Sequence, residues 1–126
     1  MSITAESKRG GIVETIGDAS HSFLLRNREI ERFEDKHRGI FDLWDGCHGS
    51  GKKPTSTEVK DLLALGLVGG GKTDAEADKI LKACNPSDLL RLLEIARAVV
   101  GIAFLPDAFD EQIESKKKIT NQPLAD

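Results

Sequence analysis

The chain has 126 residues, the size of one typical domain, and its 18 basic and 21 acidic side chains give a formal net charge of −3 at pH 7. Because both halves are slightly acidic and only 5% of the residues are aromatic, the sequence lacks the basic surface and the stacking side chains of most nucleic-acid-binding proteins. No apolar run approaches the roughly 20 residues that cross a bilayer, and the first residues lack the apolar segment of a signal peptide, so we expect a cytoplasmic protein without membrane contact.

The first predicted element is a β-hairpin over residues 11–26. Two short segments rich in β-branched and large apolar residues flank Gly17 and Asp18, a pair that favours a tight turn. Side chains alternate between the two faces of a strand, so Phe23 and Leu25 lie on the same face. An isolated hairpin is only marginally stable in water, and we therefore expect other elements to cover this one.

Apolar residues at helical spacing come next and predict a helix over about 28–46. Asn27 is a candidate N-cap for this helix, and Gly39 can divide it into two. The following segment, 46–53, is polar and rich in glycine, which predicts a flexible loop.

Two capping boxes predict the starts of the next two helices. Thr55 and Glu58 have the required spacing, and Thr73 and Glu76 repeat it. The glycines at 69–71 favour the end of the first of these helices, because glycine readily adopts the left-handed conformation found at helix C-termini. The remaining predicted helices are therefore 56–68, 74–84 and 87–105.

Together these elements predict an α+β fold that is mostly helical, with the N-terminal β-hairpin packed on a bundle of about four helices. We expect a single globular domain over residues 11–105. The segment 1–10 is predicted to be a flexible N-terminus, and the polar segment 106–126 a flexible tail.

The segment from Gly66 to Thr73, GLVGGGKT, fits the P-loop formula completely. In a P-loop the backbone amides wrap the phosphates, Lys72 would reach them, and the hydroxyl of Thr73 would hold magnesium. However, the apolar residues before the motif have helical rather than strand spacing, and too few residues follow it for a doubly wound nucleotide fold. We therefore expect a glycine-rich helix end followed by a Thr-capped helix, with a small nucleotide-binding protein as the less favoured alternative.

No other pattern predicts an enzyme, a cofactor or a metal centre. Cys47 and His48 are adjacent, but no second Cys or His lies at ligand spacing, and Cys84 falls on the apolar face of a predicted helix. Acidic pairs, which could serve as acid and base catalysts, fall on predicted helix exteriors, where solvated side chains are the ordinary interpretation. These pairs are Glu34-Asp35 and Asp42/Asp45.

The order of these elements, and above all the junction ALGLVGGG-K-TDAEA at 64–77, resembles the small tail-assembly proteins of gene transfer agents and related siphophages. The resemblance covers about residues 10–105, and a GL-GGG turn before a capped helix with this Ala/Glu pattern is typical of that family. It implies a non-enzymatic tail assembly chaperone of the bacterial cytoplasm, which binds the helical tape-measure protein while tail-tube subunits polymerise. The family is also described as a tail-tube component, so a structural part of the particle is the alternative. Tape-measure and tail-tube proteins are the implied partners, and no catalytic residue or cofactor comes with the resemblance.

The last predicted helix supplies a candidate partner-binding site. One stripe of this helix begins with charged residues and becomes apolar at Gly101, Phe104 and Leu105. This end is either covered by the hairpin or exposed, and an exposed apolar patch typically marks a partner site. We expect a tape-measure helix, or a second copy of this chain, to dock there.

Overall fold

The computed structural model describes residues 10–107, so the flexible segments predicted at 1–10 and 106–126 lie outside the described residues apart from residues 10, 106 and 107. Two antiparallel strands, β1 (Gly11–Ile16) and β2 (Ala19–Leu24), form a hairpin in which Ile16 pairs with Ala19 across the predicted turn. Gly17 in this turn has φ +64°, a conformation that favours glycine. The helices within the described range are α1 (Asn27–Lys36), α2 (Ile40–Cys47), α3 (Ser56–Gly69), α4 (Asp74–Lys82), the 3-10 turn η1 (Pro86–Asp88) and α5 (Leu89–Phe104).

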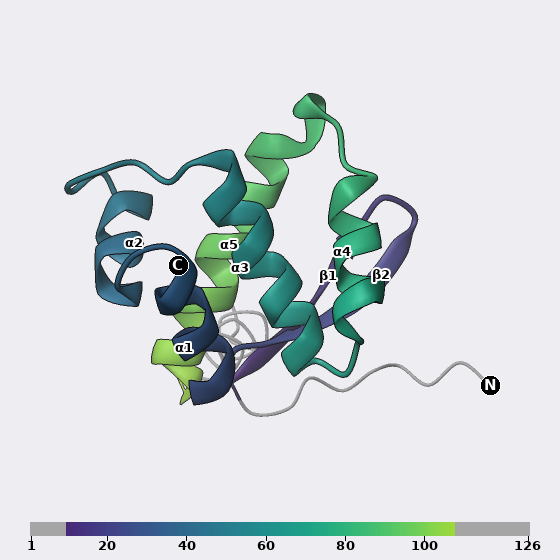
Figure 1. Cartoon of the computed structure of the whole chain (residues 1–126), viewed down its shortest axis with the longest axis horizontal. Helices are drawn as coiled ribbons and strands as arrows, with labels where there is room; N and C mark the ends of the chain where they lie inside the picture. Colours follow the sequence, from purple (N-terminus) through teal and green to yellow (C-terminus); the bar gives the residue numbers. More distant parts are fainter. Residues whose placement is uncertain (1–9, 108–126) are drawn as a thin grey trace, which may run out of the picture.

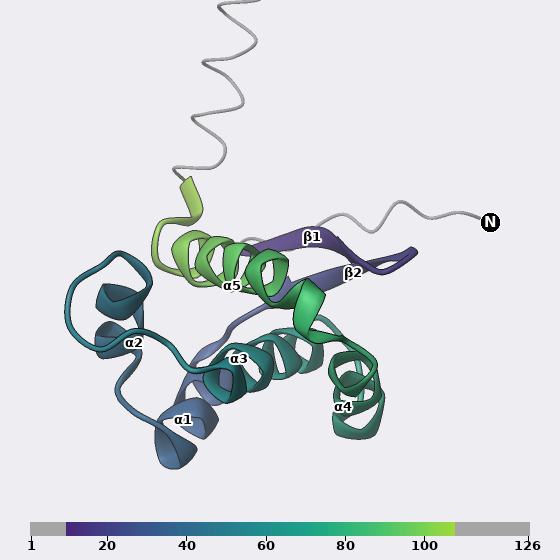
Figure 2. The ribbon, with the colours of Figure 1, turned by 90° about the horizontal axis from the view of Figure 1, so that it is seen from above.

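Helix α3 lies at the centre of the fold and packs against β2, α1, α4 and α5. The hairpin and α5 cover one side of α3, and α1 and α4 lie on its other side (Figures 1 and 2). Helix α2 packs beside α5 and α1 at the edge of the molecule. The fold is therefore α+β and mostly helical, with the hairpin packed on the helices, as predicted.

The two capping boxes form as predicted. The N–H of Glu58 donates to Thr55 Oγ1 at 3.1 Å, and the N–H of Thr55 donates to Glu58 Oε1 at 2.9 Å. The same pair of bonds joins Thr73 and Glu76, again at 3.1 and 2.9 Å. Each box satisfies two amides that a helix start would leave unpaired, so the local sequence fixes where α3 and α4 begin.

The predicted helix over 28–46 is wrong as a single element, because the chain breaks it at the predicted Gly39. Gly39 is the N-cap of α2, and the N–H of Ile40 donates to Glu34 Oε2 at 2.9 Å. The N-cap of α1 is Arg26 rather than the predicted Asn27. A glutamate three residues along the chain, Glu29, accepts the N–H of Arg26 at 2.9 Å and so replaces the expected side-chain cap.

The core lies between α3, α5 and the buried face of the hairpin. Phe23 and Leu25 are buried, as the alternation along the strand predicts. On α5 the buried face includes Ile95 and Ile102, whereas Leu93, which the helical pattern places on the main apolar face, is only half-buried. This face is wider than the predicted stripe because α5 packs against α3, the hairpin and α2 at once. The largest fully buried apolar side chains are Phe23, Phe33, Leu43, Leu62, Leu63, Leu67, Leu92, Ile95, Val99 and Val100.

Three glycines on α3 and at its C-terminus allow the backbone of β2 to lie directly on this helix. A Cβ added to Gly69 would overlap the carbonyl group of Leu24, and one added to Gly70 would overlap that of Ser22. A Cβ on Gly66 would stand 3.2 Å from the ring of Phe23. Gly69 and Gly70 of the P-loop-like motif are therefore required by close packing between helix and strand.

A buried ion pair joins the link between α1 and α2 to the start of α3. Arg38 donates to both carboxylate oxygens of Glu58, at 2.8 and 3.1 Å, and to the carbonyl oxygen of Lys52 at 2.9 Å. Burial alone would raise the pKa of Glu58, but the hydrogen bonds from Arg38 and Thr55 and the charge of Arg38 outweigh it, so the pKa lies below its ordinary value. This pair ties the loop at 46–53 to the body of the protein.

Gly69→Ala should destabilise the fold strongly, because the new methyl group meets backbone atoms that cannot rotate away. We expect the free energy of unfolding, measured by urea denaturation, to fall by about 3 kcal/mol, the upper end for an overpacked site. Gly71→Ala is the matched control: Gly71 has φ +117° and open space around its Cα, so only backbone strain of about 1–2 kcal/mol applies. Equal effects at the two positions would contradict the close packing of β2 on α3.

Glu58→Gln should lower the free energy of unfolding near neutral pH by about 1–3 kcal/mol, because it leaves the half-buried Arg38 without its charged partner. The unfolded chain binds more protons in acid, since the folded-state pKa of Glu58 lies below the ordinary value of 4.5. The contribution of the pair is therefore present above about pH 4.5 and is lost as the pH falls through the folded-state value. Urea denaturation at several pH values should show the difference between the two proteins shrinking in acid, whereas the exposed variant Glu94→Gln should differ little from the unaltered chain.

Candidate functional site

The predicted partner residues lie at the C-terminal end of α5, where α2 packs beside it. The ring of Phe104 has its centroid 5.4 Å from that of Trp44 and 5.6 Å from that of Phe41. Gly101 lies under the same indole, because a Cβ at this position would stand 3.4 Å from Trp44 Cη2. The apolar end of α5 is thus partly covered by α2, a contact that neither of the two expected arrangements, coverage by the hairpin or exposure, included.

Much of this surface stays exposed. Phe41 is 71% exposed and Leu105 is 59% exposed, while Trp44 and Phe104 are half-buried between them. We call these four residues, Phe41, Trp44, Phe104 and Leu105, the aromatic patch. Large aromatic side chains held by rigid helices are typical anchors of protein interfaces.

The sequence analysis missed Phe41 and Trp44 as members of this surface. A signal was available, because α2 carries two apolar faces, one with Ile40 and Leu43 and the other with Phe41 and Trp44. The first pair is buried in the core, so the second pair needs another contact. That this contact is Phe104 depends on tertiary packing that local spacing does not specify.

The P-loop-like segment is the end of one helix and the start of the next. The N–H groups of Gly70, Gly71 and Lys72 already donate to the carbonyl oxygens of Gly66, Val68 and Leu67. The hydroxyl and the N–H of the following threonine belong to the capping box of α4. The amides and the hydroxyl that a P-loop offers to phosphate and magnesium are therefore engaged within the protein.

Cys47 and His48 show no sign of activation. Burial raises the pKa of the Cys47 thiol despite the nearby Arg97 and Arg38, and the thiolate is the reactive form. His48 Nδ1 lies 2.8 Å from the carbonyl oxygen of Trp44, and its ring packs on the indole at a centroid distance of 4.1 Å. His48 therefore has a structural partner on α2, and Cys47 packs against the hydrophobic core.

The acidic pairs singled out in the sequence are exposed, as expected for solvated side chains. These are Glu34, Asp35, Asp42 and Asp45. Glu34 has a structural role because it accepts the N–H of Ile40 at the start of α2. Across residues 10–107, no group of three or more His, Cys, Asp or Glu side chains is arranged to hold a metal ion.

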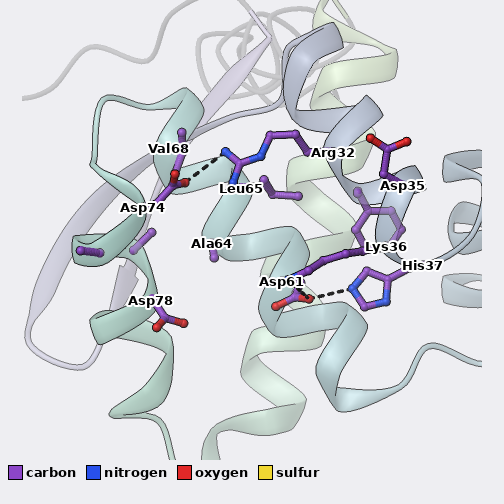
Figure 3. A pocket seen from close by; sticks show the side chains of 13 residues that line it. Arg32, Asp35, Lys36, His37, Asp61, Ala64, Leu65, Val68, Asp74 and Asp78 are labelled. Atoms are coloured by element: carbon purple, nitrogen blue, oxygen red, sulfur yellow. Dashed lines mark hydrogen bonds and ion pairs between the residues drawn. The ribbon is translucent and has the colours of Figure 1, made fainter.

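A groove with a volume of about 550 Å³ lies between α1 and α4, with α3 as its floor (Figure 3). Arg32 on α1 reaches Asp74 at the start of α4, with 3.1 Å between Nη1 and Oδ1, and this ion pair bridges the two walls. His37 Nε2 lies 2.7 Å from Asp61 Oδ2 on the floor. Nothing in the linear sequence marks this groove, because its three helices meet only in the folded chain.

Comparison with protein families, curated proteins and solved structures found no match to this chain. Of the helices in the described part of the chain, none is long and apolar enough to cross a membrane. The candidate surfaces are therefore assigned from their own geometry, and the family resemblance stays a prediction.

Saturating ATP with magnesium should leave the thermal unfolding midpoint unchanged, because a ligand raises it only by binding the folded state. Differential scanning fluorimetry measures this directly, and Lys72→Ala should behave like the unaltered chain with and without nucleotide. A rise in the midpoint that disappears in Lys72→Ala would contradict the packing interpretation of this segment.

Proposed function

We propose that this protein is a non-enzymatic assembly factor of phage or gene-transfer-agent tails, which binds the helical tape-measure protein through the aromatic patch. The tail-assembly part of the proposal rests on the sequence resemblance over residues 10–105. The binding part rests on one structural observation, the exposed cluster of large apolar side chains at the end of α5.

The aromatic patch has the properties of a docking surface. Burying a fully exposed Phe or Leu side chain contributes about 1.5–3 kcal/mol, so Phe41 and Leu105 alone offer a substantial driving force for association. Trp44 and Phe104 are held by mutual ring contacts, and a preordered surface loses little side-chain entropy on binding. An amphipathic partner helix is the simplest match, because its apolar stripe can cover a row of anchors.

The rest of the described surface supports binding rather than chemistry. The candidate thiol is not activated and the acidic pairs are solvated. The charge is nearly balanced, which suits a protein that recognises apolar helix surfaces. A structural tail-tube component would use the same patch between identical subunits, and it would polymerise alone, whereas the proposed assembly factor stays small until its partner is present.

Phe41→Asp and Leu105→Asp should each weaken association with the tape-measure protein by about 10- to 100-fold, the equivalent of 1.4–2.8 kcal/mol. Both side chains are largely exposed, so the thermal unfolding midpoint should stay close to that of the unaltered chain. Co-expression with the tape-measure protein of the same tail gene cluster, followed by affinity purification and titration, measures the loss. Phe104→Asp is less informative, because Phe104 packs on Trp44 and its replacement also disturbs folding.

Leu90→Asp is the matched control, since Leu90 is 78% exposed on the same helix but lies at its other end. It should bind like the unaltered chain. If Leu90→Asp and Phe41→Asp weaken binding equally, or if neither does, the aromatic patch is not the site. Light scattering that shows rings or tubes of the purified chain would favour the tail-tube component instead.

A further inference from the structure

The groove between α1 and α4 has the shape of a site where one more helix could pack against α3. Helices α1 and α4 both pack against α3 (Figure 2), and side chains of all three helices line the groove between them. The floor residues of α3, Asp61, Ala64, Leu65 and Val68, have the spacing i, i+3, i+4 and i+7. This is the stripe that a helix presents to a neighbouring helix. From this geometry we propose that the groove binds a cationic amphipathic helix of a partner protein, laid along α3.

The floor of the groove suits apolar side chains. Phe33 and Leu65 are buried beneath it, and Val68 is half-buried. Three of the other lining residues, Ala64, Ala75 and Ala77, are small, which leaves room for an approaching helix. The volume of about 550 Å³ lies within the range of natural binding pockets, about 300–1,000 Å³, and can take the few anchors of a helical stripe.

The rim of the groove carries an excess of negative charge, which identifies the partner as cationic. Apart from His37, its ionisable side chains are four carboxylates and two basic groups. These are Asp35, Asp61, Asp74 and Asp78, with Arg32 and Lys36. Figure 3 shows Asp61 on the floor and Asp74 and Asp78 on the α4 wall, so lysine or arginine on this flank of a bound helix meets carboxylates.

The existing ion pairs leave this charge available. Both side chains of the Arg32–Asp74 pair are exposed to solvent. Lys36 Nζ lies 3.9 Å from Asp61 Oδ2, which is a long contact for an ion pair. Asp78 pairs with the exposed Lys82 on its own helix. Exposed pairs of this kind contribute little to stability, so a partner's basic side chain can compete for Asp74 and Asp78 at little cost. Asp61 is held more firmly, because His37 Nε2 lies 2.7 Å from its Oδ2. Asp35 forms no ion pair within the described residues.

A helix fits this groove better than other ligands. An acidic rim repels nucleic acid. A helix laid along α3 would contact the floor residues Asp61, Ala64, Leu65 and Val68 together with both walls of the groove. The groove lies on the opposite side of α3 from α5, so this site is distinct from the aromatic patch and does not depend on the proposed role in tail assembly.

The test uses the full chain and fluorescein-labelled helical peptides of about 18 residues, with leucines at helical spacing and lysines on both flanks. We expect saturable binding of the lysine peptide by fluorescence anisotropy, and no binding of the same peptide with glutamates in place of lysines. Ala64→Leu fills the floor without changing charge and should weaken binding by about tenfold. Circular dichroism checks that each variant folds.

The charge of the rim is tested with a matched pair of double variants. Asp35→Lys with Asp78→Lys should weaken binding of the lysine peptide by at least about tenfold. Asp18→Lys with Glu94→Lys makes the same change in net charge at exposed sites outside the groove and should leave binding nearly unchanged. Equal weakening by both pairs would overturn the proposal, because the attraction would then be general.

Two further outcomes would overturn the proposal and separate it from the proposed function. If Phe41→Asp weakens binding of the lysine peptide and Ala64→Leu does not, the peptide binds the aromatic patch instead. If sedimentation shows a dimer that Ala64→Leu dissociates, the groove holds a second copy of this chain. Conversely, loss of tape-measure binding in Phe41→Asp leaves the groove proposal untouched.

Discussion

The contact of β2 with the C-terminal half of α3 is the constraint on which the rest of the fold depends. At Gly69 and Gly70 the strand backbone lies so close to the helix that no side chain fits between them. This contact places the hairpin across α3 and leaves the remaining sides of the helix for α5, α1 and α4. It also explains why a segment that fits the P-loop formula occurs in a protein without the strands of a nucleotide fold.

Polar interactions at the helix starts fix the elements around this contact. The capping carboxylates of α1 and α3, Glu29 and Glu58, are both buried, and each also pairs with an arginine. Glu29 stands beside Gly69, since a Cβ there would come within 3.0 Å of its carboxylate. The beginning of α1, the end of α3 and the strand β2 therefore meet at one point. A change at Glu29 or at Gly69 should therefore disturb the packing of more than one element.

Local signals in the sequence account for most of the fold. The turn at Gly17, the two capping boxes and the break at Gly39 were predictable, because each depends on neighbouring residues alone. The cap at Arg26 was not predictable. Arginine is not an ordinary N-cap residue, and the carboxylate that accepts its N–H, on Glu29, is buried only in the folded chain. The two candidate surfaces also differ in how much of each could be predicted from the sequence. Phe104 and Leu105 were identifiable from one helix, whereas the groove exists only where three separate helices meet.

The position of Trp44 gives the aromatic patch an optical signal of its own. It is the one tryptophan in the chain, and there is no tyrosine, so Trp44 dominates the near-ultraviolet absorption and emission of the protein. Its ring is half-buried and lies between His48 and Phe104. Any event that covers or uncovers this surface changes the polarity around the indole. Intrinsic fluorescence of the unlabelled chain is thus a local probe of this one surface.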